Sequence, residues 1–108
     1  MLVLRGKVLA TELPEAERQL RAAMARVGTP FDVIADISEA EPLAIDAMGG
    51  VQRLADLVVP AGLRTHIRVV GRSVQTALQF DRISRAAGYE SRLAFSLNEA
   101  QGLLDGSH

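Results

Sequence analysis

The order of apolar and polar residues along the chain predicts four short strands, each followed by a helix. Four runs are dominated by apolar and β-favouring residues, namely 2–9, 31–37, 65–70 and 92–95. The run 31–37 is almost continuously apolar, which is typical of a strand that is covered on both faces of a sheet. We therefore expect this run to form a buried strand within the sheet.

Between these runs the apolar residues recur at helical spacing and predict helices over 14–27, 43–58, 74–86 and 97–104. Each stripe of apolar residues is expected to pack on the sheet. The residues expected to face the core are Leu13, Ala16, Leu20, Ala23, Met24, Val27, Leu43, Ala47, Val51, Leu54, Ala55, Val58, Val74, Ala77, Leu78, Ile83, Ala86, Ala100, Leu103 and Leu104.

Several helix ends carry local signals. Pro60 predicts the end of the second helix, and Gly88 predicts a left-handed cap after the third. Segments 38–41 and 96–99 both have the Ser-x-x-Glu spacing of a capping box, in which each side chain bonds the backbone of the other residue. The first of these segments precedes the second helix, and the other opens the terminal helix.

Strands that alternate with helices require parallel crossover connections. We therefore expect an α/β fold with a largely parallel four-stranded sheet and helices packed on it, in the order β-α-β-α-β-α-β-α. Residues 1–105 are expected to form a single domain, and residues 106–108 a flexible tail. A chain of this length buries enough surface for one core.

Composition narrows the function classes. The 108 residues include no cysteine, carry a formal net charge of -1 and are only 4% aromatic. The charge gives no electrostatic footprint for nucleic acid or anionic lipid, and few aromatic rings are present to stack on bases. The first residues lack the order of a secretory signal, so we expect a cytoplasmic protein with no nucleic-acid or membrane partner and no disulfide.

Four segments in sequence order match strings that are common in one protein family: 4–8 (LRGKV), 33–38 (VIADIS), 61–63 (AGL) and 96–100 (SLNEA). On these segments the chain resembles the STAS domain, which is named for sulfate transporters and bacterial anti-sigma factor antagonists. The resemblance covers nearly the whole chain. It implies a STAS-like regulatory or scaffold module without enzymatic activity or cofactors, which binds a protein such as a regulatory kinase or another signalling protein.

Two departures from the family pattern matter. Family members begin with an additional strand, and its absence leaves the edge of the first strand unpaired, so a homodimer through this edge is possible. The serine that is phosphorylated in anti-sigma factor antagonists corresponds to Asp46 here. Asp46 either imitates phosphoserine with its fixed charge or is only a favourable acidic residue at a helix start.

The resemblance implies a partner-binding surface formed by two loops and a helix start. Open α/β sheets generally place their sites beyond the carboxyl ends of the strands, which supports this location independently. The residues assigned to the surface are Ser38, Glu39, Glu41, Ala44, Ile45, Asp46, Ala47, Arg72 and Ser73.

A few other residues allow a different chemical interpretation. Arg72 and the backbone around it could hold an anion, although Ser73 acting as a helix N-cap explains the same segment. A catalytic pair of Glu39 and Glu41 has no histidine nearby, and His66 has no second metal ligand at the required spacing. The alternative function is a small-ligand domain that binds a nucleotide or lipid at the carboxyl end of the sheet.

The adjacent glycines Gly49 and Gly50 lie inside the second predicted helix. Each costs about 1 kcal/mol there relative to alanine, so a compensating close approach is expected. Packing within the domain and contact with a partner both explain such a pair.

Overall fold

Strands and helices alternate along the chain, which confirms the α/β class. The computed structural model describes residues 2–5 and 13–106. In order, the elements are β1 (Leu2–Arg5), α1 (Leu13–Val27), β2 (Phe31–Asp36), α2 (Ile45–Ala55), α3 (Val58–Ala61), β3 (Leu63–Val69), α4 (Val74–Ala87), β4 (Arg92–Ala94) and α5 (Leu97–Gly106).

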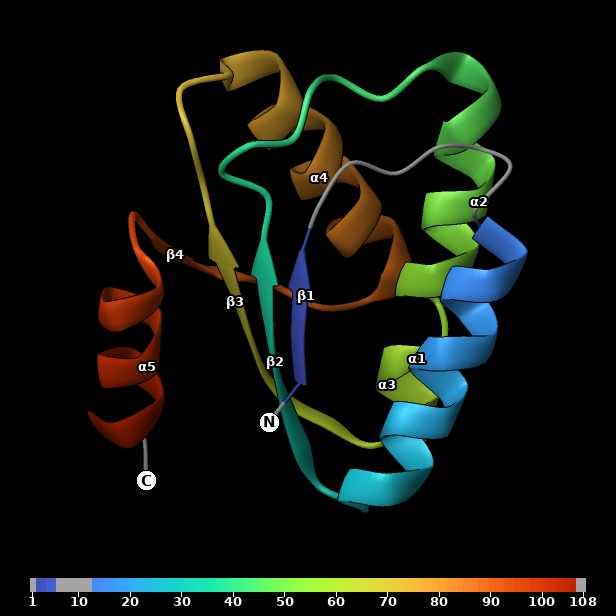
Figure 1. Cartoon of the computed structure of the whole chain (residues 1–108), viewed down its shortest axis with the longest axis vertical. Helices are drawn as coiled ribbons and strands as arrows, with labels where there is room; N and C mark the ends of the chain where they lie inside the picture. The colour runs from blue at the N-terminus through green and yellow to red at the C-terminus, as the bar shows by residue number, and fades with distance from the viewer. Residues whose placement is uncertain (1, 6–12, 107–108) are drawn as a thin grey trace.

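The strands form a parallel sheet in the order β1-β2-β3-β4, with β2 and β3 inside it and β1 and β4 at its edges (Figure 1). In the register, Ile34 lies beside Val3 on one neighbour and beside Ile67 on the other. The prediction that segment 31–37 forms a strand buried on both faces is confirmed, because Val33 and Ile34 point to opposite faces and both are buried.

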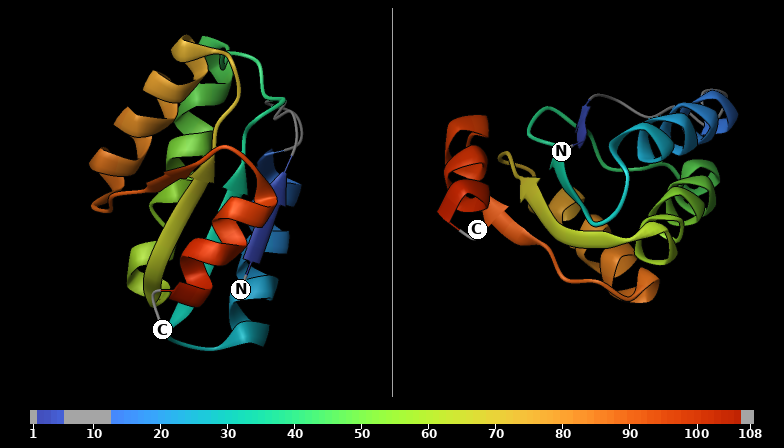
Figure 2. Two further views of the ribbon diagram at one scale, coloured as in Figure 1. Left: turned by 90° about the vertical axis from the view of Figure 1, so that its left-hand side faces the viewer. Right: turned by 90° about the horizontal axis from the view of Figure 1, so that it is seen from below.

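Helices cover the two faces of the sheet unequally. Figure 2 shows α5 alone on one face, whereas α1, α2, α3 and α4 lie on the other. On the α5 face, the apolar cluster consists of Ile34, Ile67, Val69, Ala94, Ala100 and Leu104. On the opposite face, one cluster contains Leu20, Phe31, Val33 and Val58, and a second contains Val51, Ala55 and Ile83.

The second predicted helix is in fact two helices, so Pro60 does not end it. α2 ends at Ala55, and the short α3 contains Pro60 at its third position. Proline is tolerated there because the first backbone N–H groups of a helix have no acceptor within it. Gly62 then caps α3 with a φ of 111°, a left-handed conformation that glycine adopts without steric cost.

The predicted inward stripe of α4 was partly wrong. Val74, Leu78 and Ala86 are exposed, whereas Ile83 is buried as predicted. Polar residues that hydrogen-bond to the loops and the sheet occupy the buried face instead, and these bonds fix how the helix is rotated. In α1, Val27 is also partly exposed rather than part of the core.

The predicted caps of α4 and α5 are present. Gly88 caps α4 in the left-handed conformation, and the backbone N–H of Glu99 donates to Ser96 Oγ at 3.0 Å. The Glu99 carboxylate in turn accepts from the N–H of Phe95, one residue earlier than in the usual box. Gly106, which was assigned to the tail, is the last residue of α5.

Some sequence expectations lie outside the described residues. These concern Gly6, Lys7, Val8 and Leu9 of the first predicted strand and turn, and the last two residues of the predicted tail.

Candidate functional site

The loops that leave β2 and β3 meet at the carboxyl edge of the sheet (Figure 1). The backbone N–H of Ile37 donates to the carbonyl of Val69 at 2.9 Å, which joins the two strand exits. Gly71 lies so close to the Ser38 carbonyl that a Cβ at this position would collide with it. The structure therefore brings together the two loops that the sequence predicted as one surface.

Side chains of α4 hold the β2 exit loop in place. The side-chain amide of Gln79 makes two hydrogen bonds to the backbone of Leu43: it accepts from the N–H at 2.7 Å and donates to the carbonyl at 3.2 Å. Thr76 Oγ1 donates to the carbonyl of Ala40 at 3.4 Å. Because these bonds use loop backbone, they restrain the conformation of the loop within the domain.

The predicted capping role of Ser38 was wrong. Its backbone N–H and hydroxyl both donate to Asp36 Oδ1, at 3.0 and 2.6 Å. This turn stabilises the loop, while α2 begins at Ile45 after Ala44, which provides no side-chain cap. Asp46 lies in the first turn of α2, where a negative charge is favourable.

At the β3 exit, Ser73 is the N-cap of α4 as predicted. Ser73 Oγ accepts from the backbone N–H of Thr76 at 3.1 Å and lies 2.9 Å from Thr76 Oγ1. The Arg72 side chain next to it is exposed. The cap explains the conformation of this turn without a bound anion.

The remaining predicted site residues differ in accessibility. Glu39, Glu41, Ala44, Ile45 and Asp46 are exposed at the carboxyl edge. Ala47, by contrast, is only 2% exposed and packs inward, so its side chain does not reach a partner.

Two exposed apolar side chains at this edge, Val74 and Phe95, were missed by the sequence reasoning, whereas Ile45 had been assigned to the surface. Ile45 is 91% exposed, Phe95 76% and Val74 71%. The N–H of Val70 donates to the carbonyl of Ala94 at 2.9 Å, which places Phe95 beside the loop that leads to Val74. Val74 directly follows the Ser73 cap. Its place in the first turn of α4 is the sequence signal that its side chain need not belong to the buried stripe of the helix.

We define the rim as residues 38–42, 44–46 and 72–74 together with Phe95. It combines the exposed apolar side chains with the acidic residues Glu39, Glu41 and Asp46 and the basic residue Arg72. Apolar side chains surrounded by charged ones on a preset backbone suit contact with another protein surface.

A group of buried polar residues lies on the face of the sheet that α1, α2, α3 and α4 cover. Arg68 is 3% exposed, and its Nη2 donates to the carbonyl of Phe80 and to the hydroxyls of Ser84 and Ser91, at 3.0, 3.0 and 3.1 Å. Ser91 Oγ lies 2.8 Å from His66 Nδ1. Arg68 has no ion pair with a carboxylate within the described part of the chain.

Burial shifts the acid–base chemistry of this group of residues. It lowers the pKa of His66 to about 4, and the positive charge of Arg68 acts in the same direction. Burial also lowers the pKa of Arg68 and raises that of Tyr89, whose ring centroid lies 4.7 Å from that of His66. With His66 neutral, Ser91 accepts from Arg68 and donates to His66 Nδ1, which forms a hydrogen-bonded chain from β3 to the segment before β4.

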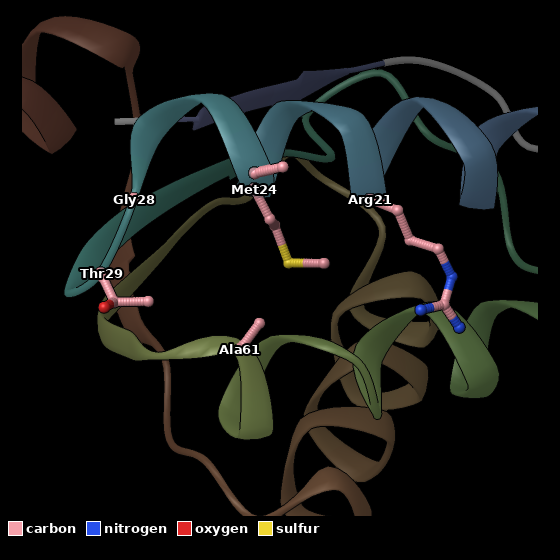
Figure 3. Close-up of a pocket in the computed structure, with 6 residues that line it drawn as sticks. Arg21, Met24, Gly28, Thr29 and Ala61 are labelled. Atoms are coloured by element: carbon pink, nitrogen blue, oxygen red, sulfur yellow. The ribbon is translucent and has the colours of Figure 1, made fainter.

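A shallow groove of about 420 Å³ lies between α1 and α3, at the end of the molecule away from the rim. Its lining consists of Arg21, Met24, Ala25, Gly28, Thr29 and Ala61. Figure 3 shows the Met24 side chain directed from α1 toward the α3 side of the groove, with Arg21 at the far end. Its mostly small and apolar lining presents few groups that could orient a polar ligand.

The two adjacent glycines of α2 have different surroundings. A Cβ at Gly50 would overlap the end of the Leu13 side chain, so this glycine lies directly under the packing of α1 on α2. A Cβ at Gly49 would meet no atom within 4 Å. Packing within the domain therefore explains Gly50 and does not explain Gly49.

Two kinds of feature are absent from the described residues. They contain no cluster of three or more acidic or histidine side chains placed to hold a metal ion. No helix among them has the length and apolar character needed to cross a membrane.

The chain matches no protein-family model, no curated protein and no solved structure in the comparisons made.

Proposed function

We propose that this protein is a STAS-like, non-enzymatic regulatory or scaffold module that binds a protein partner through the rim. The observation that carries the proposal is the exposure of Ile45, Val74 and Phe95 on backbone that internal hydrogen bonds already hold. A surface fixed in advance loses little conformational entropy on binding. The order of strands and helices is compatible with the family resemblance.

Charge indicates what kind of partner surface fits. Glu39, Glu41 and Asp46 are the exposed acidic residues nearest to Ile45 in the sequence, and Arg72 is the basic residue nearest to Val74. Complementary charges favour encounter with a partner whose apolar patch carries an excess of lysine or arginine. On the resemblance, Asp46 supplies a permanent charge where the related antagonists are phosphorylated, so the rim is expected to be constitutively in one binding state.

The alternative is a small-ligand domain at the carboxyl end of the sheet. The groove described above, within residues 13–106, lies at the opposite end, between α1 and α3. We therefore treat ligand binding as an outcome of the experiment below.

The test uses a photo-crosslinking amino acid in place of Val74 in the full chain, expressed in cells of its source. A control chain carries the same group at Val59, which is exposed on α3 at the other end of the molecule. The protein captured through position 74 and not through position 59 is then purified, and its binding is measured by calorimetry. Val74→Asp and Phe95→Asp are expected to weaken binding at least tenfold each, and Val59→Asp by less than twofold.

Two results would count against the proposal. One is a captured protein whose affinity is unchanged by both rim substitutions. The other is a saturable increase in melting temperature with a nucleotide or fatty acid and no rim-specific capture, because a ligand that binds only the folded state stabilises it.

A further inference from the structure

The exposed side of α2 carries Gly49, which packing within the domain does not explain. Side chains of opposite charge precede and follow this glycine along the helix. Ile45, Asp46, Gly49 and Arg53 fall within about 100° of the helix circumference and are all exposed. Ala47, Val51 and Ala55 occupy the buried side. We call the four exposed residues the outer face of α2.

Gly49 lies at the middle of this outer face and leaves its backbone uncovered. Glycine is among the least helix-favouring residues. Because no packing within the domain accounts for Gly49, the domain alone does not explain why a glycine stands at this position of the helix. A second helix can approach closest where no Cβ intervenes.

The charges on either side of Gly49 determine which helix fits. Asp46 lies in the first turn and Arg53 in the last turn, about 10 Å apart along the axis, with the two glycines midway between them. If a second α2 crosses antiparallel at Gly49, Asp46 of each copy faces Arg53 of the other. A parallel crossing would instead place like charges together.

Arg53 can serve both its own chain and a second copy. Its Nε donates to Glu17 of α1 at 2.5 Å, and the side chain remains 70% exposed. A guanidinium has five N–H donors, so the terminal nitrogens can reach outward while Nε holds Glu17. The Glu17 contact also limits the rotamers of Arg53 before association.

We infer that two copies of this chain form a homodimer in which their α2 helices pack antiparallel across Gly49. The contact is isologous, as expected for a two-fold dimer. It is also small, because each copy contributes a helix of 11 residues, so the dimer is expected to be weak and concentration-dependent. The dimer contact and the proposed partner share Ile45 and Asp46 of the rim, so the two associations compete there, whereas Val74 and Phe95 lie outside the dimer contact.

The other exposed helical glycine provides a contrast. Gly102 in α5 also has open space around its Cβ position. Its charged neighbours on that helix, Glu99 and Asp105, have the same sign and cannot pair across a two-fold axis. The outer face of α2 is self-complementary, and this face of α5 is not.

The test compares two charge variants by sedimentation velocity and light scattering, from about 10 µM to about 1 mM. Asp46→Arg places arginine opposite arginine, and Arg53→Asp places aspartate opposite aspartate. Each variant alone is expected to stay monomeric where the natural chain associates. Mixed in equal amounts, they are expected to form a heterodimer, because both cross-pairs are then of opposite charge.

Two further variants check the role of the glycine. Gly49→Gln is expected to weaken association at least tenfold, whereas Gly102→Gln leaves it unchanged. Val74→Asp is also expected to leave the dimer intact, which separates this inference from the proposed function of the rim. Because an unfolded variant cannot form the heterodimer, the mixture itself controls for folding.

The inference is overturned if the natural chain remains monomeric throughout, or if the mixed variants do not associate. A dimer that persists in both single charge variants would also overturn it and would direct attention to another contact, such as the outer edge of β1.

Discussion

The two faces of the sheet are held to their helices by different kinds of contact, as Ile67 and Arg68 show. These neighbours in β3 point to opposite faces, and both are buried. Ile67 joins an entirely apolar cluster beneath the single helix α5. Arg68 lies beneath several helices and hydrogen-bonds to α4 and to the segment before β4. Apolar packing therefore stabilises one face through contact area, whereas the other face also depends on a directional polar network.

The largest effect is expected on the apolar face. Ile67 is fully buried, so Ile67→Ala should lower the free energy of unfolding by about 4 kcal/mol, through lost burial and the cavity that remains. Urea denaturation measures this loss. A loss below about 1 kcal/mol would mean that α5 covers the sheet only loosely.

The next effect concerns the polar face. Arg68→Ala should cost about 3 kcal/mol, because it opens a cavity and leaves the hydroxyls of Ser84 and Ser91 short of a partner. Arg68→Met fills most of the volume and should cost clearly less. If Met proved as destabilising as Ala in the same urea experiment, hydrogen bonding rather than volume would dominate on this face.

A pH experiment examines the polar network without changing its shape. The pKa of His66 is about 4 in the folded protein and about 6.5 when unfolded, so protonation favours the unfolded state as the pH falls from 6.5 toward 4. Stability should therefore decrease by about 2 kcal/mol between pH 7 and pH 5.

The matched control is His66→Gln, which removes the titrating group and should flatten most of this slope. An equal slope in both proteins would assign the pH dependence to other groups.

The smallest effect is expected where the network meets α4. Ser84 Oγ accepts from Arg68 and donates to the carbonyl of Asp81 at 2.9 Å. Ser84→Ala should cost about 1 kcal/mol, seen as a small decrease in the urea midpoint with an unchanged slope. No measurable change would indicate that Arg68 finds sufficient acceptors in Phe80 and Ser91.

Local signals in the sequence identified the site in part. The loops after β2 and β3, the Ser73 cap and the exposed acidic residues could be placed from strand order and turn chemistry alone. The helical stripe of 43–58 also placed Ala47 inward, as observed. The exposure of Val74 could not be predicted, because a helical stripe does not reveal how a helix is rotated about its axis.

The sequence alone determined the class of the fold and most element positions, because apolar periodicity and local capping act over a few residues. Only the tertiary structure decided that α2 and α3 are separate, that Arg68 and His66 share a buried network, and that Gly50 packs on Leu13 while Gly49 does not. These outcomes depend on contacts between residues far apart in the chain, such as the 36-residue separation between Leu43 and Gln79. The residue pattern of a single segment does not specify which residues from distant segments will pack against it.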